Sequence, residues 1–140
     1  MIYFVDFETK GLNGEITELA YAERKNDGIH VTTCDPRNIL NIFEKLSDSG
    51  NNHVIFWHSF MPNYLSTKNY NALQALNGRF SCFMDFYAIF TGCSERMYTI
   101  ANTTFELTKR PHRGCAATDC VDLLLCYERA RNLLINKEGG

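Results

Sequence analysis

The sequence lacks long hydrophobic runs and any excess of positive charge, and these absences narrow the classes of protein it can belong to. No apolar stretch approaches the roughly 20 residues that a membrane-spanning helix needs. The formal net charge is −2, so no overall basic field draws the chain to nucleic acid. Met1 leads directly into an apolar segment, with no secretory leader before it. We therefore expect a cytoplasmic protein that does not enter a membrane.

The cysteines lack a familiar spacing. Six are present and none belongs to a Cys-x-x-Cys pair, so reduced and mostly buried thiols are expected. The chain also lacks repeats and low-complexity linkers. Hydrophobic residues make up 45% and charged residues 21%, a composition typical of globular proteins. We expect one domain over residues 1–140.

Short apolar segments and longer amphipathic ones alternate along the chain. Turn residues separate them, including Asn26-Asp27-Gly28 between two strand-like segments. Strands are predicted at 2–7, 16–23, 28–34, 54–57 and around 80–83. Helices are predicted from Pro36 to about 46, across 64–76, over 94–107 and over 117–135. This order predicts an α/β fold with a mixed five-stranded sheet flanked by helices.

Two carboxylates, Asp6 and Glu8, stand one residue apart at the end of the first predicted strand. Residues i and i+2 of a strand point to the same side, so both carboxylates face one spot. Such a pair attracts a hard divalent cation such as Mg²⁺ or Mn²⁺. A lone Asp-x-Glu pair is also common at solvated strand ends, so its surroundings decide between the two interpretations.

Those surroundings resemble the first motif of the DEDD 3'-to-5' exonucleases, the superfamily of polymerase proofreading domains, oligoribonuclease and ribonuclease T. Thr9-Lys10-Gly11-Leu12 follows the carboxylates, and Glu18-Leu19-Ala20 lies in the next strand. The resemblance implies a ribonuclease H-like fold along nearly the whole chain. It also implies four carboxylates, a general base, and two Mg²⁺ or Mn²⁺ ions about 4 Å apart. The expected substrate is the 3' end of single-stranded RNA or DNA, cut to nucleoside 5'-monophosphates.

The second family motif, commonly His-Asn-x-x-Phe-Asp, corresponds here to His58-Ser59-Phe60-Met61-Pro62-Asn63. Asn63 stands where the family has a metal-binding Asp, and an amide is a poorer ligand for Mg²⁺. Either a deliberate Asp-to-Asn change or a native loss of the ligand explains it. The resemblance assigns Asn63 the fourth metal position. It places the next downstream carboxylate, Asp85, at the end of a later strand in a structural role.

The third family motif, usually His-x-Ala-x-x-Asp, corresponds to the segment from His112 to Asp119. Asp119 precedes an apolar helix and fits the metal-binding Asp. His112 fits the general base, although it stands seven residues before Asp119 instead of five. Asp122 is a possible substitute for Asp119, but one helical turn onward it is expected to face solvent or cap a contact.

The resemblance also predicts residues that hold the substrate. Thr9 and Gly11 belong to the turn beside the metals, and Leu12 and Phe60 are expected to flank the terminal bases, where apolar side chains tolerate any sequence. Lys10 and Arg113 are candidates for phosphate contacts.

Two alternatives to a magnesium-dependent exonuclease remain. One is a structural zinc ion, which the cysteine and histidine residues near the third motif suggest, with these candidate ligands: Glu18, Cys93, His112, Cys115 and Cys120. The segment from Pro111 to Cys120 is also faintly similar to the exonuclease domain of arenavirus nucleoproteins, in which a zinc ion lies beside the catalytic site. The other is an exonuclease-like fold that binds nucleic acid or protein without cleaving it.

Overall fold

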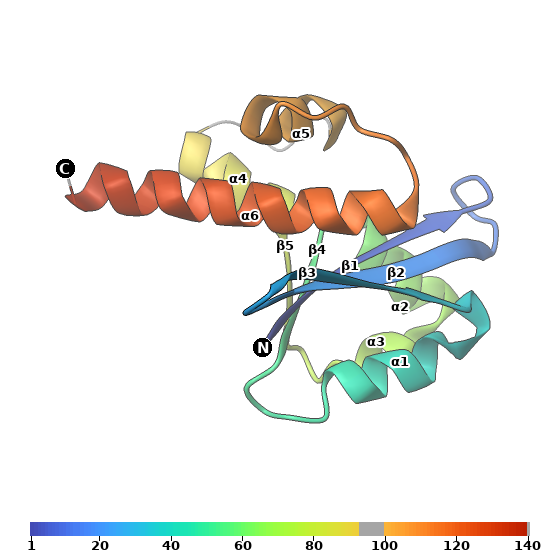
Figure 1. Ribbon diagram of the computed structural model, residues 1–140. Coiled ribbons are helices and arrows are strands. Elements are labelled where there is room, and N and C mark those ends of the chain that lie inside the picture. The colour runs from blue at the N-terminus through green and yellow to red at the C-terminus, as the bar shows by residue number, and fades with distance from the viewer. Residues whose placement is uncertain (93–99, 140) are drawn as a thin grey trace.

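The computed structural model describes residues 1–92 and 100–139, and its centre is one mixed sheet of five strands in the order β3-β2-β1-β4-β5 (Figure 1). The strands are β1 (Ile2–Thr9), β2 (Ile16–Lys25), β3 (Gly28–Cys34), β4 (His53–Phe56) and β5 (Phe80–Cys82). β2 is antiparallel to both β1 and β3, whereas β1, β4 and β5 run parallel. The predicted α/β fold with a mixed five-stranded sheet is confirmed, and its topology is compatible with a ribonuclease H-like fold.

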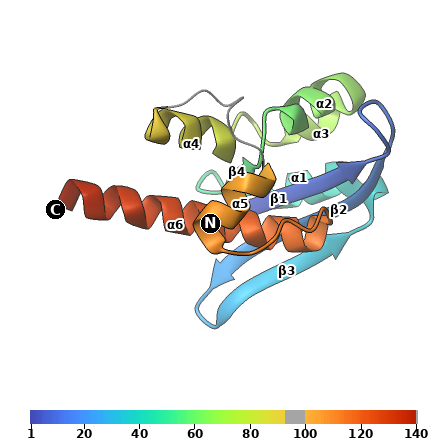
Figure 2. The same cartoon turned by 90° about the horizontal axis from the view of Figure 1, so that it is seen from above.

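Helices cover both faces of this sheet. They are α1 (Ile39–Leu46), α2 (Phe60–Lys68), α3 (Tyr70–Ala75), α4 (Phe83–Thr91), α5 (Ile100–Thr108) and α6 (Ala116–Gly139), with a 3-10 turn, η1 (Pro36–Asn38), before α1. The long α6 packs across β1 and β2 on one face, and α1 and α3 lie together on the other (Figure 1). α5 packs against α6. It lies above α6 in Figure 1 and in front of α6 in Figure 2, which views the molecule from that side.

The core brings the carboxyl end of β1 against the beginning of α6. The centre of β1, from Phe4 to Phe7, is buried between the two layers of helices. Trp57, directly after β4, is completely buried, and its indole Nε1 donates a 2.9 Å hydrogen bond to the backbone oxygen of Asp119. This bond ties the end of the central parallel strand to the first turn of α6. Trp57 is therefore a core residue, as apolar packing of this strand predicts.

The helices differ from the sequence predictions in two places, and a third prediction is only partly covered by the described residues. The single helix expected across 64–76 is two helices, because the Asn69 side chain accepts a 3.4 Å hydrogen bond from the Ala72 N–H and caps α3 as a separate helix. α4 was not predicted, since its apolar sequence directly continues the short β5 and reads as more of the same strand. The helix expected over 94–107 is confirmed from Ile100, while 94–99 lie outside the described residues.

The described helices include none that is long and apolar enough to cross a membrane.

Candidate metal centre

Three carboxylates from two distant parts of the chain meet at the corner between the end of the central strand, β1, and the beginning of α6. Asp6 and Glu8 project from the same face of β1, and Asp119 comes from the first turn of α6. One oxygen of each lies within 4.8 Å of the others. We call this group the acidic triad. The sequence predicted these three residues as metal ligands, and the structure brings them together.

The beginning of α6 is held in place by partners from the sheet. The Glu18 carboxylate on β2 accepts a 3.1 Å hydrogen bond from the Ala116 N–H, which satisfies one of the free backbone donors at the helix N-terminus. The Trp57 indole holds the backbone of Asp119 from the other side. Glu18 thus has a role that the sequence motif did not reveal, because it depends on the distance between β2 and α6.

The acidic triad carries more negative charge than its surroundings stabilise. Burial raises the pKa of Asp6 well above its usual range, and the Glu8 and Asp119 carboxylates raise it further. Burial raises the pKa of Glu8 to about 7, and Asp119 adds to the effect, although a hydrogen bond with Asp6 opposes it. Burial also raises the pKa of Asp119, against the opposing influence of His112. Each carboxyl therefore favours a proton or another cation.

The donor set fits a hard divalent cation. All three ligands are carboxylates, the donors that Mg²⁺ and Mn²⁺ prefer. Asp6 Oδ2 and Asp119 Oδ1 are buried and have no hydrogen-bond partner, so each has a lone pair that the protein leaves unused. A bound cation would satisfy these atoms and lower the repulsion among the carboxylates.

His112 reaches this corner despite its longer spacing from Asp119. Its Nδ1 atom lies 3.4 Å from Asp119 Oδ1, and the ring is 25% exposed. Gly114 adopts a φ of +76° between the two residues, a conformation that side chains disfavour, and so allows the chain to turn into α6. The structure thus places the predicted general base beside the predicted metal ligands.

A hollow of about 300 Å³ opens over the acidic triad, and we call it the triad hollow. Its lining includes Thr9 and Phe60, two of the predicted substrate-binding residues, as well as His58 and His112. Gly11 has a φ of +69° in the turn after β1, as a tight turn requires. Leu12 is 76% exposed in the same turn and is not among the lining residues.

The second motif is only partly brought to the site. His58 Nδ1 accepts a 3.2 Å hydrogen bond from the Phe60 N–H at the beginning of α2. Asn63 is exposed on α2 and is not among the residues that line the triad hollow. Its assignment as the fourth metal ligand stays a prediction. Asp85 is exposed in the first turn of α4, so its expected position at the end of a strand is wrong.

Asp122 differs from its expected place. It was expected to face solvent or cap a contact, yet it is only 1% exposed, and Arg110 Nε lies 3.3 Å from its Oδ1. Burial raises the pKa of Asp122, and Arg110 opposes the rise. The expectation that Asp122 faces solvent is wrong, because α5 packs over this face of α6.

The residues considered for zinc have other partners. Cys115 Sγ lies 2.6 Å from Thr118 Oγ1, and Cys120 Sγ donates to the Ala117 backbone oxygen at 3.3 Å. Burial raises the pKa of Cys120 to about 12, which keeps its thiol protonated. Cys93 lies outside the described residues. Within residues 1–92 and 100–139, the acidic triad is the one group of acidic, histidine or cysteine side chains close enough to share a metal ion.

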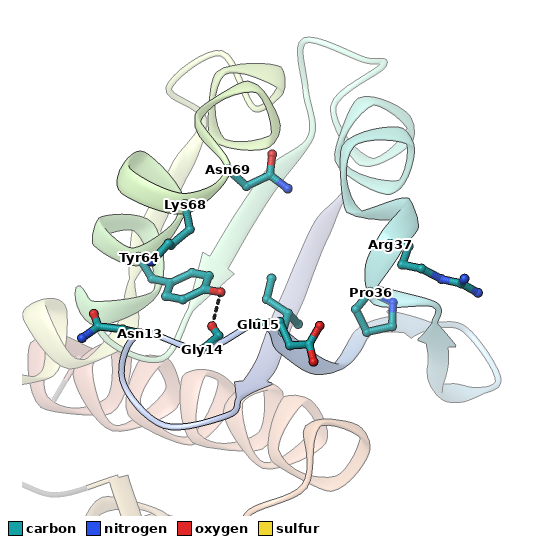
Figure 3. Close-up of a pocket in the computed structure, with 9 residues that line it drawn as sticks. Asn13, Gly14, Glu15, Pro36, Arg37, Tyr64, Lys68 and Asn69 are labelled. Carbon is teal, nitrogen blue, oxygen red and sulfur yellow. Dashed lines mark hydrogen bonds between the residues drawn. The ribbon is translucent and has the colours of Figure 1, made fainter.

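A second hollow, of about 410 Å³, is lined by the β1–β2 turn, η1 and the α2 side (Figure 3). We call it the turn hollow, and it is lined by Asn13, Gly14, Glu15, Ile16, Pro36, Arg37, Tyr64, Lys68 and Asn69. The Tyr64 hydroxyl donates a 2.6 Å hydrogen bond to the Gly14 backbone oxygen. The Tyr64 ring also lies 5.6 Å from that of Phe7 and 5.9 Å from that of Phe60. Sequence periodicity marked Tyr64 only as an apolar helix position.

No protein-family model, no curated protein and no solved structure matches this chain. The resemblance to the DEDD exonucleases therefore stays a prediction.

Proposed function

We propose that this chain is a metal-dependent 3'-to-5' exonuclease that acts on single-stranded RNA or DNA ends and releases nucleoside 5'-monophosphates. One observation carries the proposal. Three carboxylates with raised pKa values share one corner, open to a hollow, beside a histidine that can exchange a proton. Repulsion among such charges costs stability unless a cation binds there, so the arrangement favours a cation-dependent reaction.

Asp6, Glu8 and Asp119 would hold two Mg²⁺ or Mn²⁺ ions. The motif assigns the fourth position to Asn63, which is exposed on α2 outside the lining of the triad hollow. When bound, such ions polarise water and phosphate oxygens and neutralise charge that develops on the leaving oxygen. The residues of the chain provide the remaining steps. Asp119 is positioned for its role by the bond from Trp57 to its backbone oxygen.

His112 would act as the general base. Its Nδ1 is buried against the Asp119 carboxylate, which leaves Nε2 as the nitrogen that takes a proton from the attacking water. An imidazole suits this role because its ordinary pKa lies near neutrality.

The substrate strand would enter over the triad hollow with its 3' end toward the carboxylates. Phe60 lies at this hollow and is 37% exposed, so its ring offers a face on which a terminal base can stack. Thr9, Gly11 and Leu12 form the adjoining turn, where Leu12 is free to contact a second base. Stacking of this kind tolerates every base, which suits an enzyme that trims ends without regard to sequence.

A second candidate function is a binding module that retains the fold without cleavage. The exposure of Asn63 favours it, because the described residues bring together three carboxylates where the exonuclease family uses four. In either function the partner is a single strand or another macromolecule rather than a membrane. We also propose a cytoplasmic location, where cysteines without a disulfide pattern stay reduced.

Cleavage of 5'-labelled single-stranded RNA and DNA in Mn²⁺ tests the proposal. We expect the chain to produce a ladder that shortens from the 3' end, and Asp6→Asn to abolish it. Asp27→Asn is the matched control, because Asp27 is exposed in the β2–β3 turn and pairs with His30 at 2.6 Å, at residues that do not line the triad hollow. Tight binding of either strand without any cleavage would instead support the binding module.

A further inference from the structure

The segment between α5 and α6, residues 109–115, meets two acidic side chains of α6 that are one turn apart. Asp119 and Asp122 are three residues apart on a helix and so share a face. Arg110 and His112 are two residues apart, and Pro111 restricts Arg110 to extended conformations. Arg110 Nε lies 3.3 Å from Asp122 Oδ1, and His112 Nδ1 lies 3.4 Å from Asp119 Oδ1. The two pairs together set the register of the segment against α6.

The Arg110–Asp122 pair is unusual in its burial. Asp122 is 1% exposed and neither of its oxygens has a hydrogen-bond partner, whereas Arg110 is 45% exposed. A buried carboxylate with so few partners depends strongly on the cation that faces it. A second Arg–carboxylate pair of α6, between Arg24 on β2 and Glu128, is at the surface, with 48% and 34% exposure.

Hydrogen bonds fix both ends of the segment 109–115, but they do not fix the position of its middle, which contains His112. Lys109 takes a φ of +61° and ends α5, and the Arg110 N–H donates a 3.2 Å hydrogen bond to Thr108 Oγ1. At the other end the Ala116 N–H is held by Glu18. Between these points His112 has two more residues before Asp119 than the exonuclease motif allows, so a contact from outside the motif is needed to direct its ring.

We propose that the Arg110–Asp122 pair positions His112 for proton transfer, by fixing the register in which its ring meets Asp119. This inference rests on the proposed function, in which His112 is the general base. Arg110 and Asp122 are positioning residues, because they act through His112 and not on the substrate. The pair also explains how the longer spacing remains compatible with catalysis.

A double-mutant cycle tests this role. The variant Arg110→Gln with Asp122→Asn removes both charges, so that no unpaired carboxylate is left in the core. We expect it to lower kcat at least tenfold with little change in KM for a labelled oligonucleotide. When His112 is already replaced by Ala, the same pair of changes should cost no further activity, because the Arg110–Asp122 pair acts only by positioning His112. Arg110→Lys, which keeps the charge, should retain more activity than the double change. Arg24→Gln is the control for an α6 ion pair remote from the site.

A second readout does not require nuclease activity. The ring-proton resonances of His112 in the metal-free protein, assigned by comparison with His112→Gln, should shift toward those of a solvated histidine in the double variant and stay unchanged in Arg24→Gln. A shift without any cleavage by the unaltered chain would mean that the pair positions His112 but that the proposed function is wrong. Additive losses of activity in the cycle, or an unshifted His112 resonance in a folded variant, would overturn the inference.

Discussion

The triad hollow and the turn hollow are both lined in part by the stretch of chain from β1 to β2, yet they hold their charges in opposite ways. The turn hollow is larger, about 410 Å³ against about 300 Å³. Its arginine, Arg37, is exposed and pairs with Asp35 at 2.7 Å. The triad hollow instead concentrates carboxylates whose buried oxygens lack partners. Under the proposed function, uncompensated buried charge, and not the size of a hollow, distinguishes the reacting site from its neighbour.

The largest effect should come from removing one charge of the acidic triad. Asp6→Asn should lower the exonuclease rate on the order of 10³-fold, because a group that holds charge in the transition state is lost. The same change should raise the free energy of unfolding of the metal-free protein by about 1–3 kcal/mol, since it relieves repulsion between buried carboxylates. Denaturant unfolding and product ladders measure the two effects. A variant that loses both activity and stability would indicate a structural role for Asp6.

Divalent cations should stabilise the chain through the same residues. At a Mn²⁺ concentration one hundred times Kd, the free energy of unfolding should rise by about 2.7 kcal/mol. Thermal unfolding with Mn²⁺, and after its removal by a chelator, measures this change. Asp6→Asn should lose most of the effect, whereas Asp35→Asn beside the turn hollow should keep it. Equal stabilisation of the two variants would remove the distinction between the hollows.

The pH dependence of stability should follow the raised pKa of Glu8. The folded protein binds this proton more tightly than the unfolded chain, because the pKa rises from 4.5 to about 7 on folding. Stability of the metal-free chain should therefore fall as pH rises through this interval. Glu8 is only half-buried and solvent screens its charge, so we expect a loss of about 1–2 kcal/mol. Unfolding measured at pH 5 and pH 7.5 tests the sign, and saturating Mn²⁺ should reverse it.

A smaller effect is expected at the turn hollow. Tyr64→Phe removes the hydroxyl that donates to the Gly14 oxygen but keeps the ring against Phe7 and Phe60. Loss of this hydrogen bond should cost about 1 kcal/mol of stability. Activity should fall less than tenfold, through a looser turn beside Thr9, while Mn²⁺ stabilisation remains. A loss of activity as large as that of Asp6→Asn would give the turn hollow a direct part in the reaction.

The smallest effect should follow Asn63→Asp. Asn63 is exposed on α2 and outside the lining of the triad hollow, so an added carboxylate there should change the rate by less than about tenfold. The same labelled-strand assay measures it. A ladder that appears only in this variant would show instead that Asn63 occupies the fourth metal position and that the substitution restores it.

Local patterns predicted the sheet and much of the site. Asp6 and Glu8 were recognised because i and i+2 of a strand share a face, and the apolar segments identified all five strands. Asp119 and His112 depended on the resemblance, and the structure brings both to the triad. Asp122 escaped prediction because a helical period cannot show that α5 covers that face of α6. The roles of Glu18 and Tyr64 were also not predicted, because their hydrogen bonds join residues that are distant in sequence.

The most direct test of the central claim is anomalous diffraction from crystals of the chain soaked in Mn²⁺ with a short single-stranded oligonucleotide. The account predicts anomalous peaks between the Asp6, Glu8 and Asp119 carboxylates, with the 3'-terminal nucleotide over the triad hollow beside Phe60. Absence of any peak at the triad, with the strand bound elsewhere, would contradict it.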